Sequence, residues 1–132
     1  MSGEKDLQAL LMRMRPVLDP ERYVFATTNT PERYADIPAI MRFSEEEGET
    51  LILAQEAAQA AGLEASDPYV RITLSVHSAL DAVGFLAAAC TALAQEGISS
   101  NAVAAYHHDH IFVPYARADD AMRALQALSA AA

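Results

Sequence analysis

Four histidines and one aspartate are the side chains of this chain best suited to binding a ligand or a metal ion. Three of the histidines fall within four consecutive positions, His107–His110, with Asp109 among them. The fourth, His77, stands where a predicted strand gives way to a predicted helix. Polar groups gathered at the ends of apolar elements indicate either a ligand site or a tight turn.

The segment His107–His110 has three interpretations. As a hairpin connection, with a two-residue loop at His108-Asp109, its side chains fan outward and do not converge. As an extended strand, it places His108 and His110 on one face and His107 and Asp109 on the other. Two imidazoles on one face could contribute to a metal site, but structural zinc takes four ligands. We favour a structural turn or interface over a ligand or subunit contact, and we predict no metal and no cofactor.

The stretch from His77 to Gly84 is the stronger candidate for a ligand site. Ser78-x-x-Asp81 fits a capping box that opens a helix, and a helix N-terminus presents unpaired N–H groups to which a carboxylate can bind. An amine on the same ligand would need acceptors such as Asp81 or Asn101. Gly84 inside the helix costs roughly 1 kcal/mol against alanine, which close approach of a ligand would offset. Alternatively, Ser78 and Asp81 simply cap the helix and Gly84 lets it pack on the sheet.

The elements that position these residues follow from hydrophobic periodicity and turn residues. Asp19-Pro20 predicts a turn, and Gly48 suits the positive φ of a hairpin connection. The predicted helices cover residues 5–14, 55–61, 78–97 and 118–130, and the predicted strands cover 22–28, 39–43, 50–54, 69–76, 101–106 and 111–115.

The order of these elements predicts an α+β fold built from two ferredoxin-like βαββαβ units in tandem. We expect the first unit, with a leading helix, at residues 1–65 and the second at residues 66–132. The first unit lacks its first helix and the second lacks its fourth strand. We therefore expect the halves to exchange a strand, so that one strand crosses over and completes the sheet of the neighbouring half.

Composition excludes several classes of function. The 132 residues are 52% hydrophobic and 20% charged, which is enough to form a packed core. A net charge of −9 argues against nucleic acid or an anionic membrane as the partner. The single Cys90 excludes an internal disulfide, and its apolar helical setting indicates packing. Without a secretory segment or an apolar run of roughly 18 residues, we predict a soluble cytoplasmic protein.

Five segments resemble those of small bacterial tandem ACT-domain proteins, which are related to the ACT domains of aspartokinases. His77–Phe85, Gly97–Asn101 and Tyr106–Pro114 are similar to the C-terminal unit of that family. Tyr23–Phe25 and Glu47–Leu51 are similar to its N-terminal unit. The resemblance covers nearly the whole chain, and Tyr106–Pro114 is its most specific part.

The resemblance implies a pair of βαββαβ units that bind an amino acid or another small effector at an interface between units and regulate another protein. We therefore predict a non-enzymatic regulatory protein that forms a homodimer. The predicted ligand-binding residues are His77, Ser78, Leu80, Val83, Gly84 and Asn101, with His107, His108, Asp109 and His110 as interface or ligand contacts. One alternative is a structural module that joins subunits and binds nothing small. Another is a metal-binding enzyme that uses His107–His110.

Overall fold

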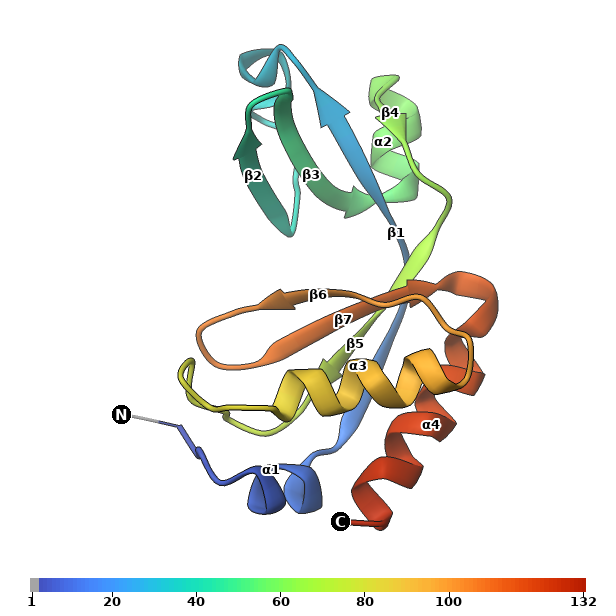
Figure 1. The fold of residues 1–132 in the computed structure, drawn as a ribbon. Helices are drawn as coiled ribbons and strands as arrows, with labels where there is room; N and C mark the ends of the chain where they lie inside the picture. The colour runs from blue at the N-terminus through green and yellow to red at the C-terminus, as the bar shows by residue number, and fades with distance from the viewer. Residues whose placement is uncertain (1–2) are drawn as a thin grey trace. The chain divides into compact units, whose positions relative to one another are not determined.

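A computed structural model describes residues 3–132 (Figure 1). The helices are α1 (Leu7–Arg13), α2 (Gln55–Ala61), α3 (Phe85–Gln95) and α4 (Ala118–Ala130), with 3-10 helices η1 (Pro31–Tyr34) and η2 (Tyr115–Arg117). The strands are β1 (Pro16–Thr28), β2 (Met41–Glu45), β3 (Gly48–Ala54), β4 (Glu64–Ala65), β5 (Tyr69–Leu74), β6 (Asn101–Ala104) and β7 (Asp109–Pro114). Within the described residues, no helix is long and apolar enough to cross a membrane.

Two compact units divide the chain, and one of them is discontinuous. Unit 1 comprises the chain up to Pro20 together with Val70–Ala132, and unit 2 comprises Glu21–Tyr69. The long strand β1 passes from one unit into the other at Pro20. The prediction divides the chain into two continuous units that meet at residue 65. The compact units of the structure instead group the N-terminal segment with the C-terminal half.

In unit 1, the strands lie in the order β1-β5-β7-β6. In chain order, β5-α3-β6-β7-α4 is a βαββα run, and the first residues of β1 provide the fourth strand of a ferredoxin-like sheet. The prediction that one strand completes the sheet of the neighbouring half is therefore confirmed.

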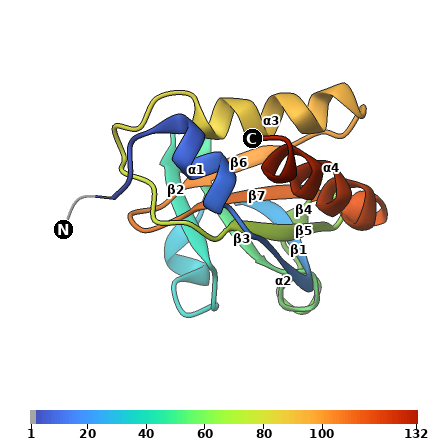
Figure 2. The ribbon, with the colours of Figure 1, turned by 90° about the horizontal axis from the view of Figure 1, so that it is seen from below.

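The three helices α1, α3 and α4 pack on one face of the sheet of unit 1 (Figure 2). Alternate residues of β5 point to that face, because side chains of a strand alternate between its two sides. The fully or almost fully buried core residues of unit 1 include Leu10, Met14, Val70, Ile72, Leu74, Phe85, Ala89, Leu93, Ile111, Val113 and Leu125.

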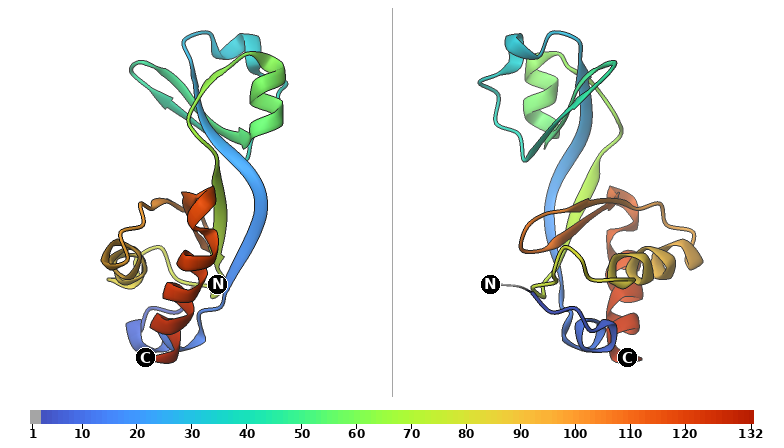
Figure 3. Two further views of the ribbon diagram at one scale, coloured as in Figure 1. Left: turned by 90° about the vertical axis from the view of Figure 1, so that its right-hand side faces the viewer. Right: turned by 60° about the vertical axis from the view of Figure 1, so that its left-hand side comes forward.

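Unit 2 has the strand order β2-β3-β1. The short β4 pairs with β1 along the edge that faces away from β3. Antiparallel registers join Tyr23 to Ala54 and Met41 to Ile52. Helix α2 packs against β3 (Figure 3), and the short η1 stands where a ferredoxin-like unit has its first helix. The core of this unit is smaller and consists of Val24, Ala26, Leu51, Leu53 and Ala58.

The turn predicted at Asp19-Pro20 is wrong, because β1 continues through both residues. Proline lacks the N–H that a ladder hydrogen bond requires, so it is tolerated only where that bond is not needed. Pairing of β1 with β3 begins at Tyr23. Pro20 therefore lies outside that ladder, and its presence does not stop the strand.

The helix predicted from residue 78 is also wrong at its start, because α3 begins at Phe85. Residues 75–84 form an irregular loop, which we call the site loop. Gly84 is the N-cap of α3 with φ 88°, a left-handed conformation that favours glycine. The glycine predicted to interrupt the helix thus precedes it.

Candidate functional site

A small cavity lies in unit 1 where the site loop meets the β6–β7 hairpin and the first turn of α3. Its volume is about 150 Å³. It is lined by Ser78, Ala79, Leu80, Ala82, Phe85, Leu86, Ala104, Ala105 and Asp109. An engineered cavity of about this volume in another protein holds one benzene molecule. The cavity therefore has room for a ligand of roughly six non-hydrogen atoms.

A buried carboxylate forms part of the wall of this cavity. Asp109 is 9% exposed and Ser78 is 7% exposed, and Ser78 Oγ donates a hydrogen bond to Asp109 Oδ2 at 3.3 Å. Burial raises the pKa of the Asp109 carboxyl, and the hydrogen bond from Ser78 opposes that rise in part. The other lining residues are uncharged. The wall thus carries an acidic group without a cationic partner among the residues that line the cavity.

The N-terminal turn of α3 forms another part of the wall. Its N-cap, Gly84, has no side chain to cap the helix, and the first intrahelical hydrogen bond runs from Ala88 N to Gly84 O at 2.9 Å. The backbone N–H groups of Phe85 and Leu86 precede that bond, so neither has a partner within the helix. Both residues line the cavity. The partial positive charge of the helix therefore lies beside the space that a ligand would occupy.

Residues Gly3–Lys5, which we call the N-terminal strap, hold the site loop from outside. Glu4 N donates to His77 O, and Ala79 N donates to Glu4 O, both at 3.0 Å. A Cβ on Gly3 would lie 2.7 Å from Ala79 N and 2.8 Å from His77 O. Only glycine allows the two backbones to approach so closely.

The strap also explains why no helix begins at Ser78. The predicted capping box needs the side chain of Ser78 and free N–H groups in the residues that follow. Instead, Ser78 donates to Asp109, and Ala79 N–H donates to the strap. Asp81 forms an exposed ion pair with Lys5 at 2.8 Å, which lowers the pKa of its carboxyl. Each group of the box thus has a partner distant in sequence.

The structure brings some of the predicted ligand residues to the cavity and leaves others away from it. Ser78 and Leu80 line the cavity, although Leu80 is also 68% exposed on its outer side. Val83 is 83% exposed and is not among the lining residues. Gly84 is not among the lining residues, and as the N-cap of α3 it contributes backbone groups only. Asn101 is exposed and is the first residue of β6, whereas Ala104, the last residue of that strand, lines the cavity.

The segment His107–His110 forms the end of a hairpin and the start of β7. Ala105 N donates to His108 O at 3.0 Å, so the hairpin connection covers residues 105–108. Of the interpretations left open, a hairpin connection is formed, but not through a two-residue loop at His108-Asp109. The rings of His77 and His107 meet edge to face, with centroids 5.3 Å apart. In residues 3–132, no group of three or more His, Cys, Asp or Glu side chains could hold a metal ion.

His110 belongs to the other face of the sheet of unit 1. Its Nδ1 lies 2.9 Å from Thr73 Oγ1. Burial lowers the pKa of His110, and the positive charge of Arg71 adds to this effect. Because Asp109 and His110 are adjacent in a strand, their side chains point to opposite faces, and only Asp109 lines the cavity.

The corresponding end of unit 2 is a wider and more polar depression. It has a volume of about 560 Å³ and is lined by Thr27, Thr28, Asn29, Thr30, Arg33, Tyr34, Glu47, Gly62, Leu63 and Glu64. Most of these residues are exposed. The depression is therefore a surface feature of the segment that follows β1.

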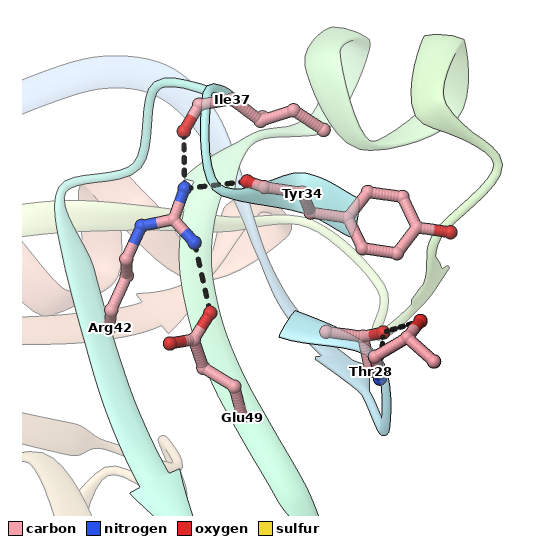
Figure 4. Close-up of polar contacts among 6 residues, drawn as sticks. Thr28, Tyr34, Ile37, Arg42 and Glu49 are labelled. Carbon is pink, nitrogen blue, oxygen red and sulfur yellow. Dashed lines mark hydrogen bonds and ion pairs between the residues drawn. The ribbon is translucent and has the colours of Figure 1, made fainter. Parts of the chain in front are cut away.

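Arg42 fixes this segment to the β2–β3 hairpin (Figure 4). Its Nη1 donates to Glu49 Oε1 at 2.9 Å, and its Nη2 donates to the carbonyl oxygens of Tyr34 and Ile37 at 3.0 and 2.5 Å. Thr28 Oγ1 accepts from Thr30 N at 3.0 Å at the start of the same segment. These contacts pair the charges of Arg42 and Glu49 with each other and tie the segment after η1 to the hairpin.

Sequence reasoning missed the apolar wall of the cavity, formed by Phe85, Leu86, Ala104 and Ala105. It named Asp109, but only as one member of the histidine cluster. The extended-strand interpretation separated Asp109 from His108 and His110, and in the structure Asp109, Ile111 and Val113 alternate on the helix-facing side of β7. That alternation depends on where the strand begins, and the prediction began it at residue 111.

The sheet order and one-sided helix layer of unit 1, together with the shorter unit 2, define a tandem ferredoxin-like α+β protein. Two family models described as ACT domain match the chain, one at residues 2–70 and the other at residues 68–127. The chain belongs to the ACT domain family, and it contains two such domains in tandem. The resemblance found in the sequence is thereby confirmed.

Several solved structures have the same fold. A Vibrio cholerae protein of unknown function, described as a possible transport protein, is 47% identical, with a TM-score of 0.85 over 95% of this chain and 97% of that one. An Agrobacterium tumefaciens protein is 16% identical, with a TM-score of 0.73 over 89% and 90% of the two chains. The ligand-free regulatory subunit of aspartate kinase from Thermus thermophilus is 14% identical, with a TM-score of 0.61 over 86% and 95%. No curated protein matches the chain.

Proposed function

We propose that this chain is a non-enzymatic regulatory protein whose unit 1 cavity binds an amino acid as effector. One observation carries the proposal: the cavity is lined by the buried Asp109 and by the first two residues of α3, whose N–H groups have no partner within the helix. An α-amino acid has the complementary pair of charges. Its ammonium group would bind Asp109, and its carboxylate would bind the N–H groups of Phe85 and Leu86.

Family membership supports a regulatory role. ACT domains commonly bind amino acids in regulatory proteins, and structures with this fold include regulatory subunits of aspartate kinase. By analogy, we propose that the chain forms a homodimer and transmits effector binding to another protein. Light scattering of the purified protein tests the dimer, and a monomer at all concentrations would exclude it. The cytoplasmic location stays a prediction of the sequence.

A thermal-shift panel of the twenty amino acids tests effector binding. At about 100 times its dissociation constant, an effector should add about 2.7 kcal/mol to the free energy of unfolding. Asp109→Asn should abolish this gain, because the amide cannot pair with an ammonium group. Asp81→Asn is the matched control, since Asp81 lies on the site loop but does not line the cavity. A panel in which no amino acid stabilises the protein at millimolar concentration would refute the proposal.

A further inference from the structure

We infer that the unit 1 cavity selects amino acids with a very small, uncharged side chain, namely glycine, alanine and serine. This inference rests on the proposed function, and it names the class of effector that the cavity accepts. Its evidence is the volume of the cavity and the chemical character of the residues that line it.

Volume sets the first limit. The cavity holds about 150 Å³, which is the size of a site for benzene, a molecule of six carbon atoms. The part common to all α-amino acids, with its amine, carboxylate and α-carbon, already has five non-hydrogen atoms. Only about one or two further atoms fit, so alanine and serine fill the space and branched or aromatic side chains exceed it.

The walls of the cavity have little freedom to retreat from a larger ligand. Phe85 is 2% exposed and belongs to the core of unit 1, so moving its ring would disrupt that core. Ala104 and Ala105 line the cavity from the β6–β7 hairpin, and neither has a long side chain that could swing aside. Leu80 is the exception, because it is largely exposed and comes from the site loop.

Charge sets the second limit. Asp109 is needed for the ammonium group, and the remaining lining residues provide no cation and no second carboxylate. An acidic side chain would meet the carboxylate of Asp109, and a basic one would compete with the ligand's own ammonium group for it. A buried charge without a partner is costly. The hydroxyl of a serine ligand, in contrast, can exchange hydrogen bonds with Ser78.

Titration calorimetry with glycine, alanine, serine, valine, glutamate, lysine and phenylalanine tests the inference. We expect binding of at least one of the first three, and at least ten-fold weaker binding of each of the other four. Ala104→Leu fills the cavity and should weaken binding of the best ligand at least ten-fold. Ala102→Leu, on the same strand but not in the cavity wall, should change it less than two-fold. Circular dichroism of both variants verifies that they fold.

A second variant enlarges the cavity without altering the core. Leu80→Ala removes a largely exposed side chain and should bring valine to within about three-fold of alanine. If a large or charged amino acid binds best to the unaltered protein, and Asp109→Asn abolishes that binding, the size inference is wrong while the proposed function stands. If no amino acid binds at all, the proposed function itself fails.

Discussion

The two units place different structures at the same end of the same kind of sheet. In unit 1, β5 is followed by the site loop and then by the eleven-residue helix α3. In unit 2, the corresponding part of β1 is followed by the four-residue 3-10 helix η1. In the first arrangement, the first two residues of α3 and the buried Asp109 line one cavity. In the second, Arg42 and Glu49 form an ion pair.

This difference indicates that a common sheet order does not by itself create a ligand site. In unit 1, Asp109 accepts a hydrogen bond from Ser78 but has no cationic partner among the residues that line the cavity. The strap holds the site loop through the backbone of His77 and Ala79. In unit 2, Arg42 uses its donors to fix the chain segment after η1. We expect ligand binding to depend on unit 1 and local stability to depend on Arg42 in unit 2.

The largest effect should come from the cores, which test whether the units are separate. Leu10 is fully buried in unit 1 and Leu53 is 1% exposed in unit 2. Leu10→Ala and Leu53→Ala should each lower the free energy of unfolding by about 2–5 kcal/mol. Hydrogen exchange should quicken mainly in residues 70–132 for Leu10→Ala and mainly in residues 21–69 for Leu53→Ala. Equal loss of protection across the chain in both variants would contradict the division.

The next largest loss of stability should come from the β2–β3 turn of unit 2. Gly48 has φ 147°, and a Cβ there would lie 2.3 Å from the carbonyl oxygen of Thr28. Gly48→Ala should therefore destabilise the protein by about 1–3 kcal/mol. Gly62, with φ 69° and no atom within 4 Å of its Cβ position, provides the comparison. Gly62→Ala should cost about 1 kcal/mol, from backbone strain alone. Chemical denaturation measures both, and a larger loss in Gly62→Ala would refute the steric argument.

A smaller effect should follow from loosening the strap of unit 1. Gly3→Ala introduces a Cβ within 2.8 Å of the backbone of the site loop, so the strap must move away. The amide of Ala79 should then exchange at least ten-fold faster, since its acceptor is Glu4 O. Lys5→Ala keeps the backbone hydrogen bonds and removes only an exposed ion pair, so it should change that rate less than two-fold. An unchanged rate in Gly3→Ala would show that the strap does not restrain the loop.

The smallest effect concerns pH and distinguishes the two carboxylates of the site region. The pKa of Asp109 is raised from its ordinary value of 3.8 by burial, so the folded state keeps its proton to higher pH than the unfolded state does. Its contribution to stability therefore falls as the pH rises from 3.8 through the raised value. Asp109→Asn should gain stability relative to the unaltered protein over that window.

Asp81 provides the opposite sign. Its pKa is lowered by the hydrogen bond to Lys5, so its contribution is present above pH 3.8 and is lost as the pH falls through the lowered value. Asp81→Asn should therefore lose stability relative to the unaltered protein at neutral pH, and the loss should vanish in acid. Urea unfolding of both variants from pH 3 to pH 7 checks the signs, and parallel curves would contradict them.

Local signals in the sequence were sufficient for several elements. Helix α2 ends at Gly62 as predicted, because that glycine adopts φ 69° and its N–H donates to Gln59 O. The bounds of α4 were also predicted, with Asp119 and Asp120 in its first turn. Cys90 packs against the core of unit 1, in agreement with its apolar setting. For α2 and α4, the deciding interactions lie within a few residues along the chain.

The start of α3 could not be predicted, because its determinants are distant in sequence. Ser78 and Asp81 match a capping box, but their partners are Asp109 and Lys5. Residues 77 and 79 bond to Glu4, more than seventy positions away. A pattern of spacings within one segment carries no information on such partners. Of the residues predicted to bind a ligand, Ser78 and Leu80 line the cavity, whereas the apolar residues of its wall were not predicted.

The discontinuity of unit 1 has a consequence for how the chain matures on the ribosome. Residues 3–20 emerge first, but the rest of unit 1 begins at Val70. The intervening segment Glu21–Tyr69 can condense as soon as it has left the exit tunnel, whereas the leading segment must wait until the last helix has been synthesised. Such non-local closure slows folding. Translation thus produces unit 2 early, and the cavity of unit 1 is assembled last.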